Sequence, residues 1–313
     1  MRYPSAVTTS SGASRHLLPQ EREKGSLFYA DLTLNGLIFG SIYALMAVGL
    51  TLVYGLLRIL HIAHAAVYAF GAFVTVVVAN ATGSIALAVF VAMVASALLG
   101  VAIYRLLYEP LLRHPPYVAM IASMGLFVFM EDGYRIVFGE QGLTFRDNPY
   151  LLQTHDWFGL TINSVQIAML LVSTLCLAAL GLFLAHTRTG TAWRATVSNP
   201  TMAASFGIDA VKVRYLNFWI GSALAGLAGA LIALLDNFVE PSMGFVVSYK
   251  ALAIIVLGGL GSIAGTLIAS YALGLIESFG TLALQAYLDR DAIAFLFLIA
   301  VLIVRPQGLM GAK

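Results

Sequence analysis

The sequence predicts an all-α, polytopic membrane protein with about eight or nine transmembrane helices, some of them short or broken. Hydrophobic residues fill 60% of its 313 positions and charged residues only 10%, whereas charged residues normally make up about 25% of a soluble domain. The mean hydropathy is +0.90, and several apolar runs approach the roughly 20 residues that cross a bilayer. The net charge of +2 gives no indication of a nucleic-acid partner.

The beginning of the chain differs in composition from the rest. Its first 26 residues are polar, rich in Ser and Thr, and without the apolar core of a signal peptide. We therefore expect residues 1–30 to form a mobile N-terminal tail and residues 31–313 to form one membrane domain. The single cysteine, Cys176, lies in an apolar run, which excludes an internal disulfide and a cysteine-based metal site.

Three apolar stretches follow the tail. A full span is expected at about residues 32–57, where Gly36 and Gly40 form a G-x-x-x-G pair typical of closely packed membrane helices. Residues 61–79 are apolar but begin with two histidines, so they are interpreted as either a short span or a re-entrant helix. A span at about residues 84–107 then leads into a basic, proline-containing loop, which the positive-inside rule places in the cytoplasm.

Two spans are expected in the middle of the chain, at about residues 117–138 and 165–184. The loop between them carries three acids against one arginine and contains aromatic residues that suit a membrane–water interface. We therefore expect this loop to face outward. The second span returns the chain to residues 187–216, which we call the basic segment.

The last part of the chain continues with a span at about residues 215–235 that is dense in small residues, as in tightly packed helices. Residues 250–260 are apolar but too few to cross a bilayer comfortably, and they end in the sequence GGLGSIAG. Further spans are expected at about residues 266–288 and 292–304. The C-terminal tail is basic, which predicts a cytoplasmic C-terminus.

The two short stretches leave the number of spans open between eight and nine. In each half of the chain, a full span precedes a short helix broken near glycine or histidine, and another full span follows. This order is consistent with an internal repeat and with a translocation site at membrane depth. Two apolar halves of similar composition would give the same pattern by chance.

Residues at or near the broken segments are candidates for a translocation pathway. The two histidines are three positions apart and share a helical face, but no acid or cysteine lies nearby, so capping of a broken helix is favoured over metal binding. The glycines follow G-x-G-x-x-x-G spacing without the Lys-Ser/Thr of a phosphate-binding loop. The acid Glu277 lies inside a predicted span, and both a functional and a structural role remain open for it. The candidates are His61, His64, Gly258, Gly259, Gly261 and Glu277.

The basic segment stands out because it separates two long apolar runs. Arg188, Arg194, Lys212 and Arg214 outweigh Asp209, which gives 4 − 1 = +3. Its alanines favour helix and its Asn-Pro pair predicts a break followed by a new helix. Such a segment suits a contact with a cytoplasmic partner. The chain has neither a nucleophile–base motif nor an ATP-binding motif, so it is not expected to be an enzyme, and any ATP-driven work requires another polypeptide.

Four sequence runs resemble the permeases of branched-chain amino acid ABC transporters of the Liv type. They are NGLIFGSIYALMAVGLTLVYGLLRILHIAHAAVYAFGAF, GTAWRATVSNPTMAASFGIDAVKVRYLNFWIGSALAGLAGAL, ALAIIVLGGLGSIAGTLIASYALGLIES and the closing RPQGL, and the resemblance covers about residues 30–310. It implies a multi-pass protein of the bacterial inner membrane that pairs with a second, homologous permease. It further implies two cytoplasmic ATP-binding subunits, which carry ATP and Mg, and an extracytoplasmic solute-binding protein; no cofactor is expected in this chain.

The resemblance also implies roles for individual residues. His64 matches the histidine of the family's N-F-A-H-G signature, although Ala66 stands where an acidic residue is common. The residues expected in the loop that contacts the ATPase are Gly190, Arg194, Asn199, Ala203, Ala204, Gly207 and Ile208.

Alternative functions stay open at this stage. Urea and short-chain amide importers share the same framework, so the exact substrate is not determined. A proton-coupled secondary transporter would need several intramembrane carboxylates as a relay, and Glu277 is the one acid well inside a predicted span. A membrane-embedded enzyme would need a clustered catalytic set, which the sequence lacks.

Overall fold

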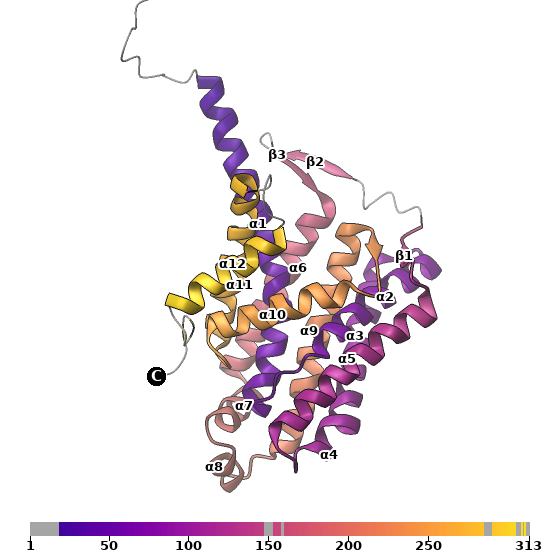
Figure 1. The fold of residues 1–313 in the computed structure, drawn as a ribbon, viewed down its shortest axis with the longest axis vertical. Coiled ribbons are helices and arrows are strands. Elements are labelled where there is room, and N and C mark those ends of the chain that lie inside the picture. Colours follow the sequence, from indigo (N-terminus) through magenta and orange to yellow (C-terminus); the bar gives the residue numbers. More distant parts are fainter. Residues whose placement is uncertain are drawn as a thin grey trace, which may run out of the picture.

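The computed structural model describes residues 19–146, 153–157, 160–284, 290–304, 308 and 310. Helices dominate this part of the chain, with two small β-ribbons at the ends of helices (Figure 1). The long and intermediate helices are α1 (Pro19–Leu57), α2 (His64–Thr82), α3 (Ile85–Ile103), α5 (Pro116–Phe138), α6 (Ser164–His186), α9 (Ala210–Asp236), α10 (Met243–Gly258), α11 (Ile263–Leu284) and α12 (Arg290–Val304).

The predicted all-α membrane class is confirmed. Six helices of the described chain are long and apolar enough to cross a membrane. The shorter apolar α10 has 16 residues and α12 has 15, while α5 has 23 residues but carries charges near its C-terminal end. The six long ones contain residues Leu27–Leu57, His64–Thr82, Ile85–Leu111, Ser164–His186, Ala210–Asp236 and Ile263–Leu282.

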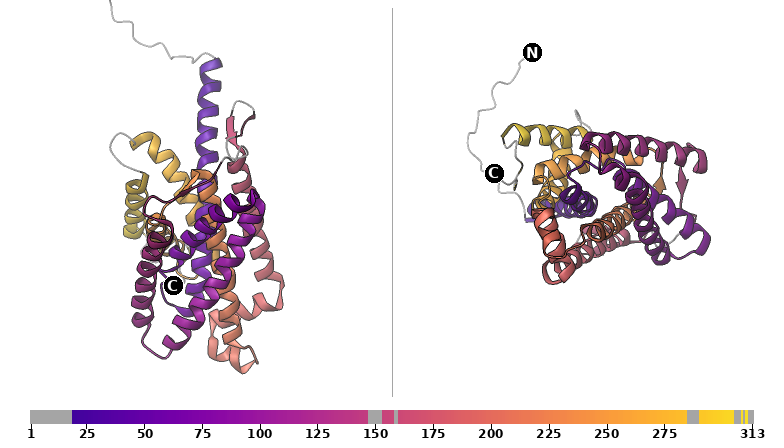
Figure 2. Two further views of the ribbon diagram at one scale, coloured as in Figure 1. Left: turned by 90° about the vertical axis from the view of Figure 1, so that its right-hand side faces the viewer. Right: turned by 90° about the horizontal axis from the view of Figure 1, so that it is seen from below.

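Several boundaries differ from the sequence-based expectation. The first helix begins at Pro19 rather than near residue 32, so residues 19–30 of the predicted tail are helical, and residues 1–18 lie outside the described part. The N-terminal part of α1 extends beyond the other helices (Figure 2). The short apolar stretch predicted at residues 250–260 is a longer helix, because α10 already begins at Met243.

The two β-ribbons were not predicted. Strand β2 (Thr154–Trp157) pairs antiparallel with β3 (Leu160–Asn163) in the loop before α6. Strand β1 (Leu143–Thr144), which follows α5, pairs antiparallel with β4 (Phe238–Val239), which follows α9. Each strand is only two to four residues long, too short to give the alternating sequence pattern on which strand prediction relies.

The order of elements supports the internal repeat. In the first half α1, α2 and α3 follow one another, and in the second half α9, α10 and α11 do so. The break after the first helix of each half contains a non-glycine residue in the left-handed region, Arg58 with φ 55° and Asn237 with φ 53°. The two halves pack on each other: α1 of the first half lies along α11 of the second, and α9 of the second lies along α3 of the first.

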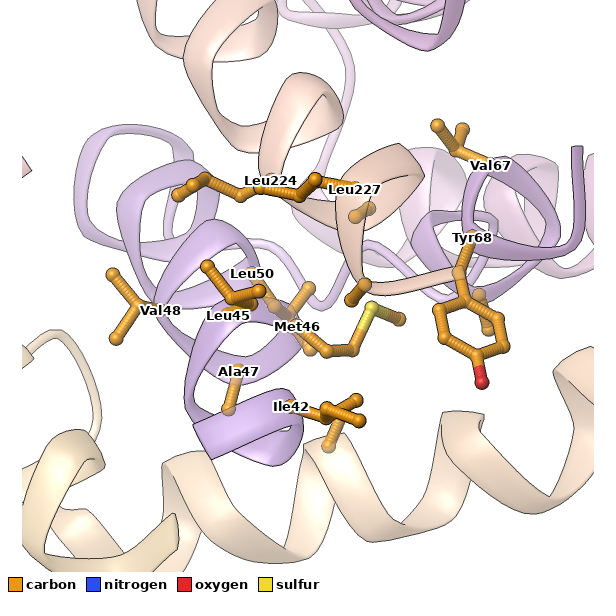
Figure 3. Close-up of a cluster of buried hydrophobic side chains, with 14 of the residues drawn as sticks. Ile42, Leu45, Met46, Ala47, Val48, Leu50, Val67, Tyr68, Leu224 and Leu227 are labelled. Carbon is orange, nitrogen blue, oxygen red and sulfur yellow. The ribbon is translucent and has the colours of Figure 1, made fainter. Parts of the chain in front are cut away.

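The centre of the molecule is built around α1 and α9. Leu45 and Val48 of α1 are completely buried, and Leu224 and Leu227 of α9 project into the same cluster (Figure 3). The two helices are antiparallel, since Gly49 meets Gly221 while Leu52, further along α1, meets the earlier residue Asn217 of α9. The interior of the bundle is therefore formed where the two halves meet.

Small residues allow these helices to approach closely. A Cβ atom placed on Gly36 would lie 2.9 Å from the Leu275 backbone of α11, and one on Gly49 would lie 2.7 Å from the Gly221 carbonyl oxygen. A Cβ on Gly71 of α2 would overlap the backbone of Gly226 in α9. Lipid provides no hydrophobic drive for helices to associate, so such backbone contacts carry much of the packing energy.

The Gly71 contact gives a first prediction. Gly71→Ala should destabilise the fold by about 1–3 kcal/mol, because the added methyl forces α2 and α9 apart. The measurement is the midpoint of thermal unfolding of the purified protein in detergent. Gly125→Ala in α5 is the control, since no atom lies within 4 Å of a Cβ there; equal midpoints for the two variants would contradict this packing account.

Candidate functional site

The basic segment folds into two short helices, α7 (Arg188–Ser198) and α8 (Pro200–Ser205), between α6 and α9. The side chain of Thr187 accepts a hydrogen bond from the Gly190 N–H and begins α7. That of Asn199 accepts from the Met202 N–H and begins α8, with Pro200 in its first turn. These are favourable N-terminal capping interactions. The predicted helical character and the break at Asn199-Pro200 are confirmed.

Helix α7 is tied firmly to the membrane helices. The Trp193 indole N–H donates to the Asn217 side-chain oxygen of α9 at 3.0 Å, and the Asn217 amide donates to the Leu52 carbonyl of α1 at 2.7 Å. Arg194 donates to the Leu184 carbonyl of α6, and Gly190 packs against the backbone of Leu184. Helix α7 thus contacts α6 and α9 directly, and Asn217 continues the connection to α1.

Helix α8 and the turn after it present an exposed surface. Phe206 is 80% exposed and Met202 is 60% exposed, although they belong to a polar connection and not to a long apolar helix. Gly207 has φ 80°, a conformation that favours glycine. Helices α7 and α8 lie at the opposite end of the molecule from the β2–β3 ribbon (Figures 1 and 2).

The seven predicted loop residues differ in their exposure and contacts. Ala204 and Gly207 are exposed on the α8 side, together with Asn199. Gly190 and Ala203 are buried, and Ile208, whose N–H donates to the Ala203 carbonyl, is half-buried. Arg194 points back to α6. The exposed residues Phe206 and Met202 were not predicted as part of this surface. The sequence analysis considered the charged and small residues of the segment but not its apolar side chains.

The single acid of the basic segment, Asp209, is ionised. The backbone N–H of Lys212, supported by that of Val211 and by the Lys212 ammonium at 3.4 Å, holds the pKa of Asp209 below its usual value. Asp209 is therefore ionised at neutral pH, and its N-cap position begins α9. The net +3 is the full sum of the four cations and this one acid.

His61 lies in the break between α1 and α2, His64 is the first residue of α2, and both are buried. The Nδ1 atom of His61 is 2.6 Å from the Tyr108 hydroxyl and 3.4 Å from the Ser123 hydroxyl. The His61 and His64 rings meet edge to face at 5.5 Å. Tyr108 belongs to η1 (Tyr104–Tyr108), a π-helical turn that continues α3 and leads through α4 (Glu109–Leu111) toward α5. The described residues contain no group of three side chains suited to a metal.

The three candidate glycines form the turn between α10 and α11. Gly259 and Gly261 adopt φ 98° and 86°, and Gly258 packs directly on the Gly265 backbone. The Gly258 carbonyl also accepts a hydrogen bond from the Met310 N–H. Their observed contacts are those of a tight turn.

Glu277 lies at the centre of a buried charge cluster. Its side chain in α11 is completely buried. One carboxylate oxygen is 2.9 Å from the Lys250 ammonium of α10, and the other accepts hydrogen bonds from Arg290 Nε and the Tyr43 hydroxyl, both at 2.7 Å. Lys250 also pairs with Asp291 at 2.8 Å. We call Glu277, Lys250, Arg290, Asp291 and Tyr43 the charge cluster.

The charge cluster joins four helices, α1, α10, α11 and α12. Its two cations and two carboxylates sum to zero, which limits the high cost of charges in a membrane interior. The Arg290 guanidinium also stacks 3.7 Å from the centre of the Phe39 ring, a favourable cation–π contact. The sequence identified Glu277 but not its partners, because Lys250 was placed at the start of a short apolar stretch and Arg290 between two predicted spans.

Comparison with known proteins then decides the family. The family model described as branched-chain amino acid transport system, permease component, matches residues 32–304. The chain belongs to this family. The part of the chain that matches contains both the charge cluster and the α7–α8 segment.

Individual relatives agree with the family model. The permease LivH of the high-affinity branched-chain amino acid transport system of Escherichia coli (strain K12) is 32% identical over 300 residues, which cover 91% of this chain and 96% of LivH. BraD of Pseudomonas aeruginosa is 32% identical, with 90% and 96% covered. LivM of Escherichia coli (strain K12) is 27% identical, with 92% and 70% covered. No solved structure matches the chain significantly.

The charge cluster gives the second prediction. Glu277→Gln should destabilise the protein by about 3–5 kcal/mol, because it leaves buried cations without a compensating charge. The double variant Glu277→Gln with Lys250→Met should recover part of this loss. The measurement is thermal unfolding in detergent at fixed pH.

The matched control is Asp132→Asn. It removes a salt bridge to Arg135, 2.8 Å long, in which both side chains are about half exposed, so a change of only about 0–1 kcal/mol is expected. A Glu277→Gln variant as stable as this control would show that the charge cluster does not hold the helices together.

Proposed function

We propose that this chain is the permease subunit of an ATP-driven ABC importer for branched-chain or related small amino acids in the bacterial inner membrane. In this proposal it pairs with a second homologous permease and two cytoplasmic ATP-binding subunits, and an extracytoplasmic solute-binding protein delivers the substrate. ATP and Mg are bound by the partner ATPases. The observation that carries the proposal is the α7–α8 segment, which is exposed at one end and fixed to three membrane helices at the other.

The α8 surface has the properties of a docking element. An exposed aromatic residue at the tip of a short helix can fill a pocket on a partner, and aromatic anchors of this kind dominate binding energies. Phe206 is such an anchor, and the exposed cations Arg188 and Lys212 belong to the same basic segment. The matching partner surface would be an apolar groove with an acidic rim on the ATPase.

Motion of the docked ATPase would reach the membrane through α7. The Trp193–Asn217–Leu52 hydrogen bonds link α7 to α9 and α1, the two helices that form the centre of the bundle. Closure of the ATPase pair would move these helices relative to their neighbours. This supports α7–α8 as a transmission element, not an active site.

The similarity to two permeases of one transport system supports the pairing. LivH and LivM of Escherichia coli are both named as permeases of the high-affinity branched-chain amino acid transport system, and both align with nine-tenths of this chain. Positive charge on α7–α8 favours a cytoplasmic position for this end. The cytoplasmic C-terminus belongs to the same proposal.

The charge cluster weighs against proton-coupled transport. A relay carboxylate must exchange protons with water, whereas Glu277 is completely buried and bound on both oxygens by Lys250, Arg290 and Tyr43. A urea or short-chain amide importer remains the second candidate, since the same α7–α8 docking would serve it.

The third prediction concerns docking. Phe206→Ala should lower ATP-dependent uptake by the assembled transporter at least about tenfold, because it removes a central aromatic anchor. Co-purification of the ATPases with the permease in detergent should fall in parallel, while the amount of permease in the membrane stays unchanged.

Ile136→Ala is the control for this prediction. Ile136 is 85% exposed, but in α5, far from the α7–α8 segment in the sequence. Its substitution should leave both co-purification and uptake unchanged. Normal uptake and normal ATPase binding by Phe206→Ala would refute docking through α8.

The fourth prediction concerns Gly207, which also lies at the end of α8. Gly207→Val should uncouple ATP hydrolysis from uptake while leaving membrane insertion intact. The reason is the left-handed backbone of Gly207, which a β-branched residue adopts only with strain, so the turn that presents Phe206 is redirected. ATP hydrolysis and substrate uptake are measured on the same proteoliposomes, and an unchanged ratio would show that the turn is not part of the coupling.

A further inference from the structure

A cavity of about 320 Å³ lies beside the charge cluster. Small-molecule sites usually have volumes of about 300–1,000 Å³, so this cavity is large enough for a small ligand. Its walls come from α1, α2, α9, α10 and α12, so both halves of the repeat contribute. Figure 3 shows three of its lining side chains, Ile42, Met46 and Tyr68, directed toward a common space.

Both charged and apolar side chains line this cavity. The cations Lys250 and Arg290, which pair with Glu277 and Asp291, come from α10 and α12, and Asp236, the last residue of α9, brings a further carboxylate. Apolar side chains, including Ile42, Met46 and Ile232, also line it. The lining therefore offers both signs of charge and an apolar surface within one space.

The Tyr68 hydroxyl is an available polar group in this cavity. The Tyr68 side chain is 98% buried, with 2% exposed, and its hydroxyl points away from α2 toward α10 (Figure 3). Within the described chain, no hydrogen bond to this hydroxyl is found, and buried tyrosine hydroxyls usually have a partner. The group is thus placed to donate to something that enters the cavity.

We propose that this cavity binds one molecule of a small zwitterion with an aliphatic side chain, an aliphatic α-amino acid, on its way through the permease. The ligand carboxylate lies toward Arg290, Lys250 and the Tyr68 hydroxyl, and its ammonium group lies toward Asp236. The side chain rests on Ile42, Met46 and Ile232. The inference rests on the proposed function and adds the position and chemistry of the substrate site.

The surroundings of the cavity fit a point of entry followed by a closed path. Asp236, an exposed residue of the cavity lining, ends α9 just before strand β4. Met46 lines both this cavity and a second pocket that includes His61 and His64. That second pocket has no room for a water molecule, so the path toward the histidines is closed at Met46 in this conformation.

The chemistry distinguishes amino acids from the alternative substrates. Urea and short-chain amides contain no charged group. Their binding would remove water from the charged side chains of the cavity without forming an ion pair in return. A ligand with only one charge would interact with either the two cations or Asp236. A zwitterion can interact with both.

The test is protection of an introduced thiol by the ligand. Cys176→Ala removes the native thiol, and Val247→Cys places a new one on the cavity wall. The transporter with its second permease and ATPases, without the binding protein, is placed in nanodiscs. Labelling by a small methanethiosulfonate is then followed with increasing L-leucine. Ile232→Cys serves as a second reporter if Val247→Cys fails to assemble.

Leucine should slow labelling of the reporter in a saturable manner. Isoamylamine, 4-methylpentanoate, urea and acetamide should protect much less. In the same background, Tyr68→Phe should raise the half-protecting leucine concentration at least about tenfold, as expected for loss of a hydrogen bond to a charged group. Tyr104→Phe is the matched control, because Tyr104 is an equally buried tyrosine that does not line the cavity, and it should leave this concentration unchanged.

A reporter outside the cavity guards against general effects of leucine. Ser205→Cys lies on exposed α8, and its labelling should not respond to leucine. Equal protection by leucine, urea and acetamide, or no protection by leucine in a complex that imports leucine with ATP, would overturn the assignment of the cavity. Failure of the complete complex to import leucine with ATP would instead overturn the proposed function itself.

Discussion

Close contact between helix backbones is the constraint on which the rest of this structure depends. Membrane lipid gives helices no hydrophobic reason to associate, so stability has to come from packing and from internal polar bonds. Glycine provides that packing where Gly49 meets Gly221 and Gly71 meets Gly226. The cavity begins beyond the first of these contacts, between Ile42 and Met46 on α1 and Ile232 and Asp236 on α9. Helices α1 and α9 are thus in backbone contact at Gly49 and Gly221, and the cavity lies between them further along.

The charge cluster solves a related problem with electrostatics. Glu277 alone would be costly inside a membrane, but Lys250, Arg290 and Tyr43 occupy its oxygens. The same network holds α10 and α12 beside the cavity, which Lys250 and Arg290 line. In the proposed binding mode the ligand carboxylate joins Glu277 and Asp291 around cations whose positions the cluster already fixes.

The sequence was sufficient for the features that depend on local pattern. Apolar runs located the helices, and Asn199-Pro200 located the break between α7 and α8. The charge cluster could not be found in this way, since Lys250 is 277 − 250 = 27 positions from Glu277 and only the packing of α10 on α11 brings them together. Phe206 was hidden for a different reason: its significance is its exposure, which depends on how the segment folds.

The resulting account places a solute cavity toward one end of the bundle and an ATPase-docking segment at the other, linked by α1 and α9. Its central claim is that ATP hydrolysis on partner subunits drives an amino acid through this permease. The most direct measurement is uptake of radiolabelled leucine by proteoliposomes that contain both permeases, the ATPases and the solute-binding protein. The account predicts leucine uptake that requires ATP and persists when the proton gradient is collapsed. Uptake that follows the proton gradient and ignores ATP would contradict it.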